Sequence, residues 1–245
     1  MRGRAPKGIR GERPAHNSGR GAVGLLESRT DAVHNSALTM EFETFEPLRE
    51  IPFIAHAFTL RTNRDTKSDD FEACTLTALG FSSNRFASAE QVHGNGVAAV
   101  FETTGRRVPM VDALVTTARN LPLVIRCADC PAVFVVDQRT PAIALIHSGK
   151  KGTLANIVKD TLVAMTQRFG SDPGDCRAFI SPSIGPCHYK IDLWSGIEAQ
   201  LREAGVRDIH NPRVCTACHL DRYYSYRAEK GQTGRMLAIL ALKSP

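Results

Sequence analysis

The chain has 245 residues, of which 42% are hydrophobic and 23% charged, and its formal net charge is +6. This length suits one large domain or two small ones, and the composition is typical of a globular protein with a sizeable core. No apolar run approaches the roughly 18 residues that span a membrane, and the N-terminus lacks the apolar stretch of a secretory signal, so we expect a cytoplasmic protein without a membrane partner.

The positive charge is concentrated at the beginning of the chain. Residues 1–39 contain seven Lys/Arg and three Asp/Glu, a net of +4, which leaves only +2 for residues 40–245. A body so close to neutrality predicts no nucleic-acid partner. Six glycines and no hydrophobic period predict that residues 1–39 are a disordered basic tail, followed by a single domain over residues 40–245. We attribute the tail to an upstream start; a basic arm and a transit-like peptide are the alternatives.

Four apolar, β-branched runs follow one another in the middle of the chain. They cover residues 113–117, 121–126, 132–136 and 142–147, and their continuity predicts strands that are buried on both faces. Further apolar runs predict strands at residues 51–60, 97–101 and 236–242, with a polar loop at residues 61–70.

Two segments carry apolar residues at helical spacing. Residues 153–169 predict a helix that ends at Gly170, with Pro173 preventing its continuation. Residues 193–204 repeat the pattern before Gly205. Strands buried between helical layers predict an α/β (or α+β) fold, a multi-layered sandwich of central β-sheets flanked by helices.

Seven cysteines in a chain without an export signal argue against a disulfide framework and leave metal binding, catalysis or burial. Two CxxC pairs are present, Cys127/Cys130 and Cys215/Cys218, but the 84 residues between Cys130 and Cys215 exclude a zinc ribbon unless the fold unites the pairs. Residues 215–219 also fit a c-type haem attachment pattern, which requires an exported chain. We attribute that pattern to chance.

Three residues in separate short motifs form a candidate metal site, namely His93, Cys130 and His147. Two imidazoles and a thiolate suit Zn²⁺, or copper in a trigonal site, and three protein ligands leave one position for water or substrate. The alternative is structural, because lone histidines are usually structural and a cysteine between apolar strands is usually a small buried hydrophobe. We interpret Asp129 as a proton acceptor or as the partner of a ligating histidine, and Cys127 as a spectator.

The loop after His147 is glycine-containing and basic, and it precedes the predicted helix. Residues 148–153 read Ser-Gly-Lys-Lys-Gly-Thr, a combination that favours an anion such as phosphate beside a helix N-terminus. The loop is not a Walker A motif, because the first glycine and the Gly-Lys-Ser/Thr order are missing. A solvated Lys-rich turn is the alternative.

Five motifs occur in the order found in the YfiH family, also called the laccase-domain or polyphenol-oxidase-like family, which the chain resembles over residues 51–242. The motifs are Gln91-Val92-His93-Gly94, Asp112-Ala113-Leu114-Val115-Thr116, Ala128-Asp129-Cys130-Pro131, Ser183-Ile184-Gly185-Pro186-Cys187, and Tyr224-Ser225-Tyr226-Arg227 with Thr233-Gly234-Arg235. The resemblance implies a single multi-layered catalytic domain in which His93, Cys130 and His147 hold the metal, usually zinc.

The resemblance also implies substrate-binding residues. Arg61 is similar to a family arginine that faces the ligand, and Lys151 occupies a position that is usually arginine. Two departures lie nearby, because the loop after Arg61 lacks the usual glycines and Lys150 replaces an aromatic residue. The residues assigned to substrate and phosphate are Arg61, Gln91, Lys151, Arg227 and Arg235, and those assigned to catalysis are Asp129, Cys130 and Lys151.

Similar proteins act on purine nucleosides, by phosphorolysis of adenosine, inosine or methylthioadenosine and by deamination of adenosine. The residues are compatible, because a metal that lowers the pKa of water toward about 7 suits attack at C6 of adenine. Cationic side chains suit phosphate. We therefore expect a purine nucleoside and phosphate as small-molecule partners, and either a monomer or a homodimer.

Two other enzymatic functions use the same residues. A metal-free cysteine hydrolase would have Cys130 as nucleophile and His147 or His93 as base, and some relatives are linked to cell-wall precursor editing. A copper polyphenol oxidase (laccase) could hold a type 1 copper on two histidines and a cysteine. The chain has eight histidines and no His-x-His pair, which argues against the remaining coppers of a laccase. A binding module without catalysis comes last.

Overall fold

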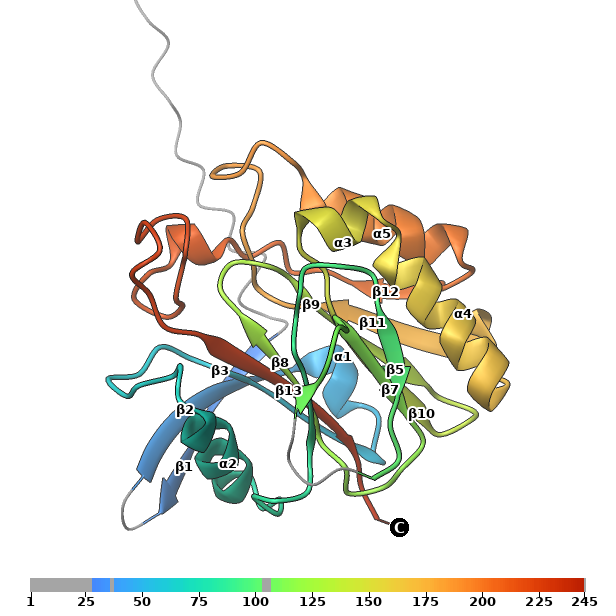
Figure 1. The fold of residues 1–245 in the computed structure, drawn as a ribbon, viewed down its shortest axis with the longest axis horizontal. Coiled ribbons are helices and arrows are strands. Elements are labelled where there is room, and N and C mark those ends of the chain that lie inside the picture. The colour runs from blue at the N-terminus through green and yellow to red at the C-terminus, as the bar shows by residue number, and fades with distance from the viewer. Residues whose placement is uncertain (1–27, 36–37, 103–106, 245) are drawn as a thin grey trace, which may run out of the picture.

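The computed structural model describes residues 28–35, 38–102 and 107–244, and within them two β-sheets pack face to face with helices on their outer sides (Figure 1). The first sheet has the strand order β1-β2-β3-β13-β8-β4-β6. Its strands are Ser28–Asn35 (β1), Leu38–Phe45 (β2), Ile54–Thr59 (β3), Ala87–Ala89 (β4), Arg107–Val108 (β6), Leu123–Cys127 (β8) and Met236–Leu242 (β13).

The second sheet has the strand order β12-β11-β9-β10-β7-β5. Its strands are Val97–Ala99 (β5), Ala113–Thr116 (β7), Ala132–Asp137 (β9), Ala142–His147 (β10), Cys176–Ile180 (β11) and Asp208–His210 (β12). Most neighbours are antiparallel, including β9 with β10 and β13 with β8, whereas β4, β5 and β12 pair in parallel with β8, β7 and β11.

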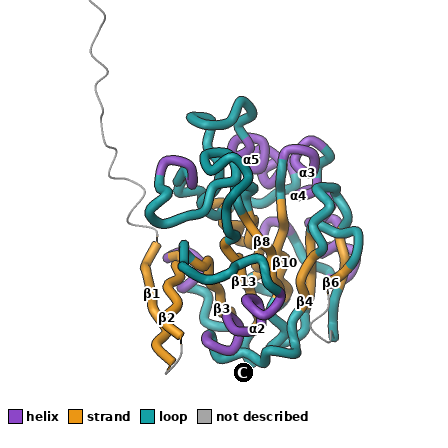
Figure 2. Tube along the Cα trace, turned by 60° about the vertical axis from the view of Figure 1, so that its left-hand side comes forward, coloured by secondary structure: helices purple, strands orange, loops and turns teal. Residues whose placement is uncertain are grey.

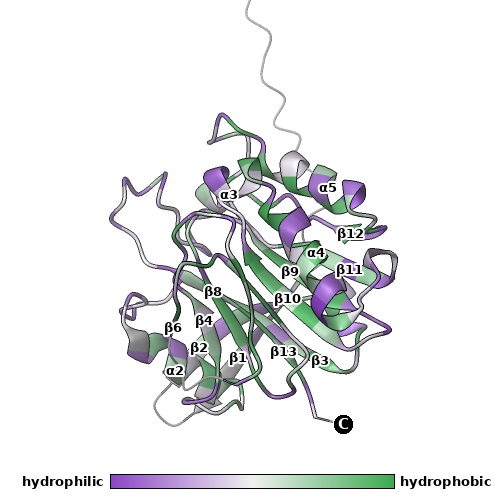
Figure 3. Cartoon of the chain, turned by 45° about the vertical axis from the view of Figure 1, so that its right-hand side comes forward, coloured by the Kyte–Doolittle hydropathy of each residue, from purple (hydrophilic) through white to green (hydrophobic). Residues whose placement is uncertain are grey.

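The helices and short helical turns connect the strands. They are Glu46–Arg49 (α1), Asp69–Ala78 (α2), Lys150–Leu154 (α3), Ile157–Phe169 (α4), Leu193–Glu203 (α5) and the 3-10 turns Pro173–Asp175 (η1) and Thr216–Cys218 (η2). Leu48 of α1 reaches into the core between the sheets. Apolar side chains of α4 and α5 pack on the outer face of the second sheet, and those of α2 pack on the outer face of the first. Figure 3 shows the central strands coloured as hydrophobic along most of their length, while α4 and α5 are mixed.

Alternating residues of the central strands face two different cores, which explains their continuously apolar sequences. In β9, Phe134 points into the core between the sheets, whereas Val133 and Val135 point into the core beneath α4 and α5. In β8, Ile125 joins the core between the sheets and Val124 joins the core beneath α2. A strand covered on both faces has no position that favours a polar side chain. The predicted multi-layered sandwich is therefore confirmed.

The predicted helix at residues 153–169 differs from the structure at its beginning. Helix α3 starts at Lys150, and Asn156 in a left-handed conformation (φ 62°) separates it from α4. Asparagine tolerates this conformation better than most residues, so it allows the chain to change direction inside one apolar stripe. Helix α2 was not expected, and its first residues belong to the predicted polar loop.

The predicted tail requires a correction for residues 28–35 and 38–39. These residues lie in β1 and β2, which pair antiparallel from Ser28 with Phe45 to Asn35 with Leu38. The physical reason is the alternation that starts at Leu38, because Met40 and Phe42 bury one face of β2 against Phe71. Residues 1–27 lie outside the described part of the chain.

The connections at one end of the two sheets gather the motifs of the candidate site. Loops lie over β8 and β10, at the end of the molecule away from the C-terminus (Figure 2). The connections from β4 to β5, β6 to β7, β8 to β9 and β12 to β13 all cross from one sheet to the other. Among the residues described, no helix has the length and apolar character that crossing a membrane requires.

The inter-sheet core predicts the effect of a large-to-small substitution at Phe134. This side chain is completely buried and stacks edge-on against Phe45, with ring centroids 5.7 Å apart. We expect Phe134→Ala to lower the free energy of unfolding by about 3–5 kcal/mol, measured by urea denaturation. Val163→Ala on α4 is the control, because Val163 is 45% exposed. Equal stabilities of the two variants would contradict the proposed core.

Candidate active site

His93, Cys130 and His147 converge at the loop end of the sheets. His93 lies between β4 and β5, Cys130 between β8 and β9, and His147 is the last residue of β10. Their ligand atoms all lie within 4.8 Å of one another, and the two imidazole rings are 4.9 Å apart and nearly perpendicular. His147 is buried, Cys130 is half-buried and His93 is exposed, so the group opens toward solvent on the His93 side.

A buried carboxylate, that of Asp112, orients the side chain of His147 and holds the backbone that carries His93. Its Oδ1 lies 2.7 Å from Nδ1 of His147 and accepts a hydrogen bond of 3.0 Å from the backbone N–H of His93. Its Oδ2 accepts one of 2.8 Å from the N–H of Gly94. Asp112 thereby fixes the ring of His147, turns the other ring nitrogen toward Cys130, and holds the loop that carries His93.

The side chains polarise one another. Burial disfavours the Cys130 thiolate, but hydrogen bonds from His147 and His93 outweigh it and lower the pKa of Cys130 to about 6. Burial also disfavours a charged His147, yet Asp112 and Cys130 raise the pKa of its imidazole to about 9. The thiol and the imidazole thus favour each other's charged forms. In contrast, burial raises the pKa of Cys127 well above its usual range, as expected for a spectator.

The backbone at Gly149 passes so close to Cys130, His93 and His147 that no side chain fits there. A Cβ at this position would lie 2.9 Å from Sγ of Cys130, 3.3 Å from Cδ2 of His93 and 3.6 Å from Cε1 of His147. Only glycine leaves this point open. The donor set of two imidazoles and a thiolate, grouped around a point kept free of side-chain atoms, fits zinc, and a trigonal copper would use the same atoms.

The three side chains open into a cavity of about 660 Å³, within the usual range for small-molecule sites. Six cationic residues and two carboxylates line it together with two tyrosines. The cations are Arg107, Arg126, Lys150, Lys151, Arg227 and Arg235; the carboxylates are Glu90 and Asp129; and the tyrosines are Tyr189 and Tyr226. Arg126 pairs with Glu72 behind the wall at 2.6 Å, and the positive charge that remains in excess of the carboxylates suits an anionic or phosphate-containing ligand.

Asp129 lies next to Cys130 in this cavity, but it does not pair with a histidine. Its Oδ1 accepts a hydrogen bond from Oγ1 of Thr216 (3.0 Å) and its Oδ2 one from the backbone N–H of Arg227 (2.7 Å). The interpretation of Asp129 as a histidine partner is therefore corrected, since Asp112 fills that position. Each Asp129 oxygen keeps a further lone pair, so its role as a proton acceptor remains a prediction.

The residues assigned to substrate and phosphate divide into two groups. Gln91, Lys151, Arg227 and Arg235 line the cavity. The amide of Gln91 also exchanges two hydrogen bonds with the backbone of Arg126, at 2.7 and 2.8 Å, which supports the cavity wall.

Arg61 is not among the residues that line this cavity. Its guanidinium forms an ion pair with Glu229 (2.8 Å), donates to the carbonyl of Tyr223, and lies over the ring of Tyr224. A separate hollow of about 510 Å³ surrounds it. The expected contact between Arg61 and the ligand remains a prediction.

Sequence reasoning missed two residues that shape the site. Asp112 belonged to a recognised motif, but an isolated aspartate before a strand does not reveal which side chain it meets. Thr216, which is completely buried, holds Asp129 from a distance of 87 residues.

The fold and the site together define an α/β protein of two stacked sheets with a His₂Cys cluster at the base of a basic cavity. The chain belongs to the family described as multi-copper polyphenol oxidoreductase laccase, whose profile matches residues 67–192 and 188–243. The expected YfiH-type membership is thereby confirmed. Arg61 lies outside the matched residues.

Relatives and a solved structure agree with this assignment. A purine nucleoside phosphorylase from Streptomyces coelicolor is 32% identical over 192 residues, which are 67% of this chain and 78% of the relative. One from Bacteroides thetaiotaomicron is 33% identical over 160 residues, 52% of this chain, and the match spans only 59% of that relative's length. The crystal structure of the hypothetical protein YfiH from Bacillus licheniformis has the same fold, with a TM-score of 0.76 at 22% identity over 82% of this chain and 96% of that one.

The Asp112 hydrogen bonds predict the effect of an isosteric change. Asp112→Asn removes the charge that orients His147, so we expect zinc affinity to fall by about 10- to 100-fold, measured by competition with a chromophoric chelator. Asp221→Asn, at an exposed carboxylate outside the cavity lining, is the control. Unchanged affinity in Asp112→Asn would show that His147 needs no such partner.

The close approach of Gly149 predicts a second effect on metal binding. We expect Gly149→Ala to lose most of its bound zinc in elemental analysis, because the new methyl group occupies the space between the ligands. Gly94→Ala is the matched control, since a Cβ there meets only ordinary contacts at 3.6 and 3.7 Å. Full zinc content in Gly149→Ala, with an unchanged circular dichroism spectrum, would contradict the proposed site.

Proposed function

We propose that the protein is a zinc-dependent purine nucleoside phosphorylase that also deaminates adenosine. The observation that carries this proposal is the His93–Cys130–His147 cluster at the base of a cavity lined by six cations and two tyrosines. The names of the relatives support the phosphorylase part. The deaminase part and the zinc dependence rest on the chemistry of the site.

The metal ligands would be His93, Cys130 and His147, with Asp112 behind His147. When bound, zinc would supply a Lewis acid that polarises an oxygen atom at the site. The low pKa of Cys130 supports this assignment, because a thiolate is the form that binds metals. Copper would fit the same donors, so the metal is tested together with the activity.

The phosphate would bind to the cationic wall of the cavity. Lys151 lies in the first turn of α3, which follows directly from the His147 strand, and its side chain is exposed. Arg227 and Arg235 also line the cavity. Their guanidinium carbons lie 5.0 Å from the ring centroid of Tyr189 and 5.9 Å from that of Tyr226, respectively. Cations from separate segments can neutralise one phosphate from several sides.

The purine would stack on the tyrosines that share this cavity, and Asp129 would move the proton. In phosphorolysis the bond between ribose C1′ and the purine nitrogen breaks, a phosphate oxygen bonds to C1′, and the purine leaves with a proton. In deamination water adds at C6 and ammonia leaves. Asp129 serves both reactions as general acid or base, within a site that places it beside Cys130.

A cysteine hydrolase is the second candidate, because Cys130, His147 and Asp112 form a hydrogen-bonded series of thiolate, imidazole and carboxylate. This arrangement is typical of nucleophilic cysteines. A cell-wall precursor would be its substrate class. Laccase chemistry is disfavoured, because the two metal-type clusters among the described residues contain only three histidines in all: His93, His147 and His188.

The proposal predicts the products of adenosine. With the zinc-loaded full chain, mass spectrometry should detect adenine and ribose 1-phosphate only when phosphate is present, and inosine also without it. His93→Ala should lose both metal and products. Lys151→Ala should raise the KM for phosphate by about tenfold, which corresponds to roughly 1.4 kcal/mol, while Lys159→Ala, at an exposed lysine outside the cavity, should not.

Three results would contradict the proposal or its choice of metal. Full activity in His93→Ala would exclude a metal role for that residue. An absence of product from the zinc-supplemented protein, combined with rapid alkylation of Cys130 without added chelator, would favour the metal-free cysteine hydrolase. Activity that appears only after copper loading would assign a different metal to the same ligands.

A further inference from the structure

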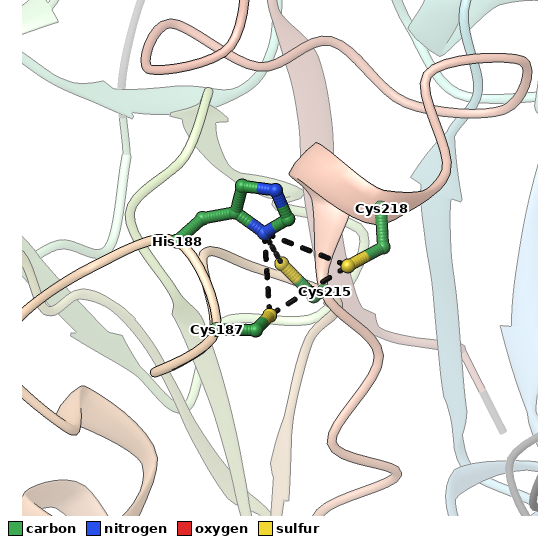
Figure 4. A group of neighbouring side chains, drawn as sticks. All are labelled: Cys187, His188, Cys215 and Cys218. Atoms are coloured by element: carbon green, nitrogen blue, oxygen red, sulfur yellow. Dashed lines mark hydrogen bonds between the residues drawn. The ribbon is translucent and has the colours of Figure 1, made fainter. Parts of the chain in front are cut away.

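A second group of metal-type ligands lies outside the active-site cavity. It consists of Cys187, His188, Cys215 and Cys218, whose ligand atoms all lie within 4.8 Å of one another. The first two come from the connection between β11 and α5, and the other two from the 3-10 turn η2 and the residue before it. Figure 4 shows the three sulfur atoms and Nδ1 of His188 pointing toward a common centre.

The separations within this group match those of a tetrahedral zinc site. The Sγ atoms of Cys187 and Cys218 are 3.6 Å apart, and Nδ1 of His188 lies 3.3, 3.7 and 3.5 Å from Sγ of Cys187, Cys215 and Cys218. Zinc bonds of about 2.3 Å to sulfur and about 2.0–2.1 Å to nitrogen imply S···S near 3.8 Å and N···S near 3.6 Å in an ideal tetrahedron.

We propose that Cys187, His188, Cys215 and Cys218 bind a second, structural zinc ion. Three thiolates and one imidazole complete a tetrahedron, so the site would be closed to substrate, unlike the three-ligand site in the cavity. The Cys215-x-x-Cys218 spacing is typical of zinc-binding turns. Residues 215–219 resembled a haem attachment pattern, but in the structure the histidine beside Cys215 and Cys218 is His188 and not His219.

The surrounding backbone is already organised for this role. Ser183 and Cys215 form an isolated parallel bridge that holds the two segments together. The N–H of Gly185 donates to Sγ of Cys215 at 3.3 Å, a contact that stabilises a thiolate. A Cβ on Gly185 would lie 2.5 Å from the Trp194 ring and 3.2 Å from Cβ of Cys215, so this close approach depends on glycine.

A zinc ion here would join two segments that also build the cavity. Tyr189 follows His188 directly and lines the cavity, where it faces Arg227. Thr216 lies between the ligands Cys215 and Cys218 and holds Asp129 by a hydrogen bond. The second metal would therefore position an aromatic wall residue and the predicted proton-transfer carboxylate without contacting substrate.

A disulfide is the main chemical alternative. Bonded sulfur atoms lie about 2.05 Å apart, and the Cys187–Cys218 separation is 3.6 Å. A disulfide between Cys187 and Cys218 would also not explain why Sγ of Cys215 and Nδ1 of His188 converge on the same point. Both thiols are exposed, so replacing either with serine should leave folding intact.

Zinc content of the full chain tests the proposal. We expect about two zinc ions per chain in wild type purified under reducing conditions, and about one in Cys218→Ser or Cys187→Ser. In the Cys130→Ser background, which removes the cavity site, about one zinc should remain and should disappear in Cys130→Ser/Cys218→Ser. Cys74→Ser, at a half-buried cysteine outside both clusters, is the matched control.

Cobalt substitution supplies a second measurement that does not depend on enzyme activity. Cys130→Ser loaded with Co²⁺ should show thiolate charge-transfer bands together with visible bands of tetrahedral cobalt, and Cys218→Ser should abolish them in this background. Unchanged zinc content in both Cys187→Ser and Cys218→Ser would overturn the proposal. So would a Cys187–Cys218 disulfide, found by mass spectrometry in protein prepared under reducing conditions.

Discussion

The candidate active site depends on one buried carboxylate. Asp112 is completely enclosed, and both of its oxygens are used: one faces His147 and the His93 amide, and the other accepts from Gly94. A carboxylate in such surroundings is stabilised only by these donors, so it holds them in fixed positions. The orientation of the His147 imidazole and the course of the backbone at His93 and Gly94 follow from this single group.

The sequence was most informative where a strand is covered on both faces. The runs that became β9, β10 and β13 are almost purely apolar, and no competing structure can bury them as well. It was less informative at edges. β1 and the first two residues of β2 were assigned to a tail, because glycine-rich composition before residue 28 hid the alternation that begins at Leu38. Short strands such as β4 and β12 have too few residues for a period to be visible.

His93, Cys130 and His147 could be singled out as candidate ligands because imidazoles and a thiol in three short motifs are chemically distinctive, while the choice of a metal over a structural role came from the family resemblance. Their partners could not be singled out, because an Asp–His or Thr–Asp hydrogen bond joins residues that the sequence places 35 or 87 positions apart. Arg61 is a different case: the family resemblance, and not its residue type, suggested a ligand contact, which stays a prediction, and its guanidinium contacts Glu229 and Tyr223. Similarly, Cys215 and Cys218 acquired meaning only when folding brought Cys187 and His188 beside them.

The connections that cross between the sheets have a mechanical consequence. His93 and Cys130 lie on two such crossings, and His147 ends a strand of the second sheet. An ion held by all three would cross-link the two sheets. Because it binds the folded state, it would raise the free energy of unfolding by mass action. Metal binding would therefore depend on the relative position of the two sheets. A small displacement of one sheet along the other would separate the ligands before it exposed the hydrophobic core.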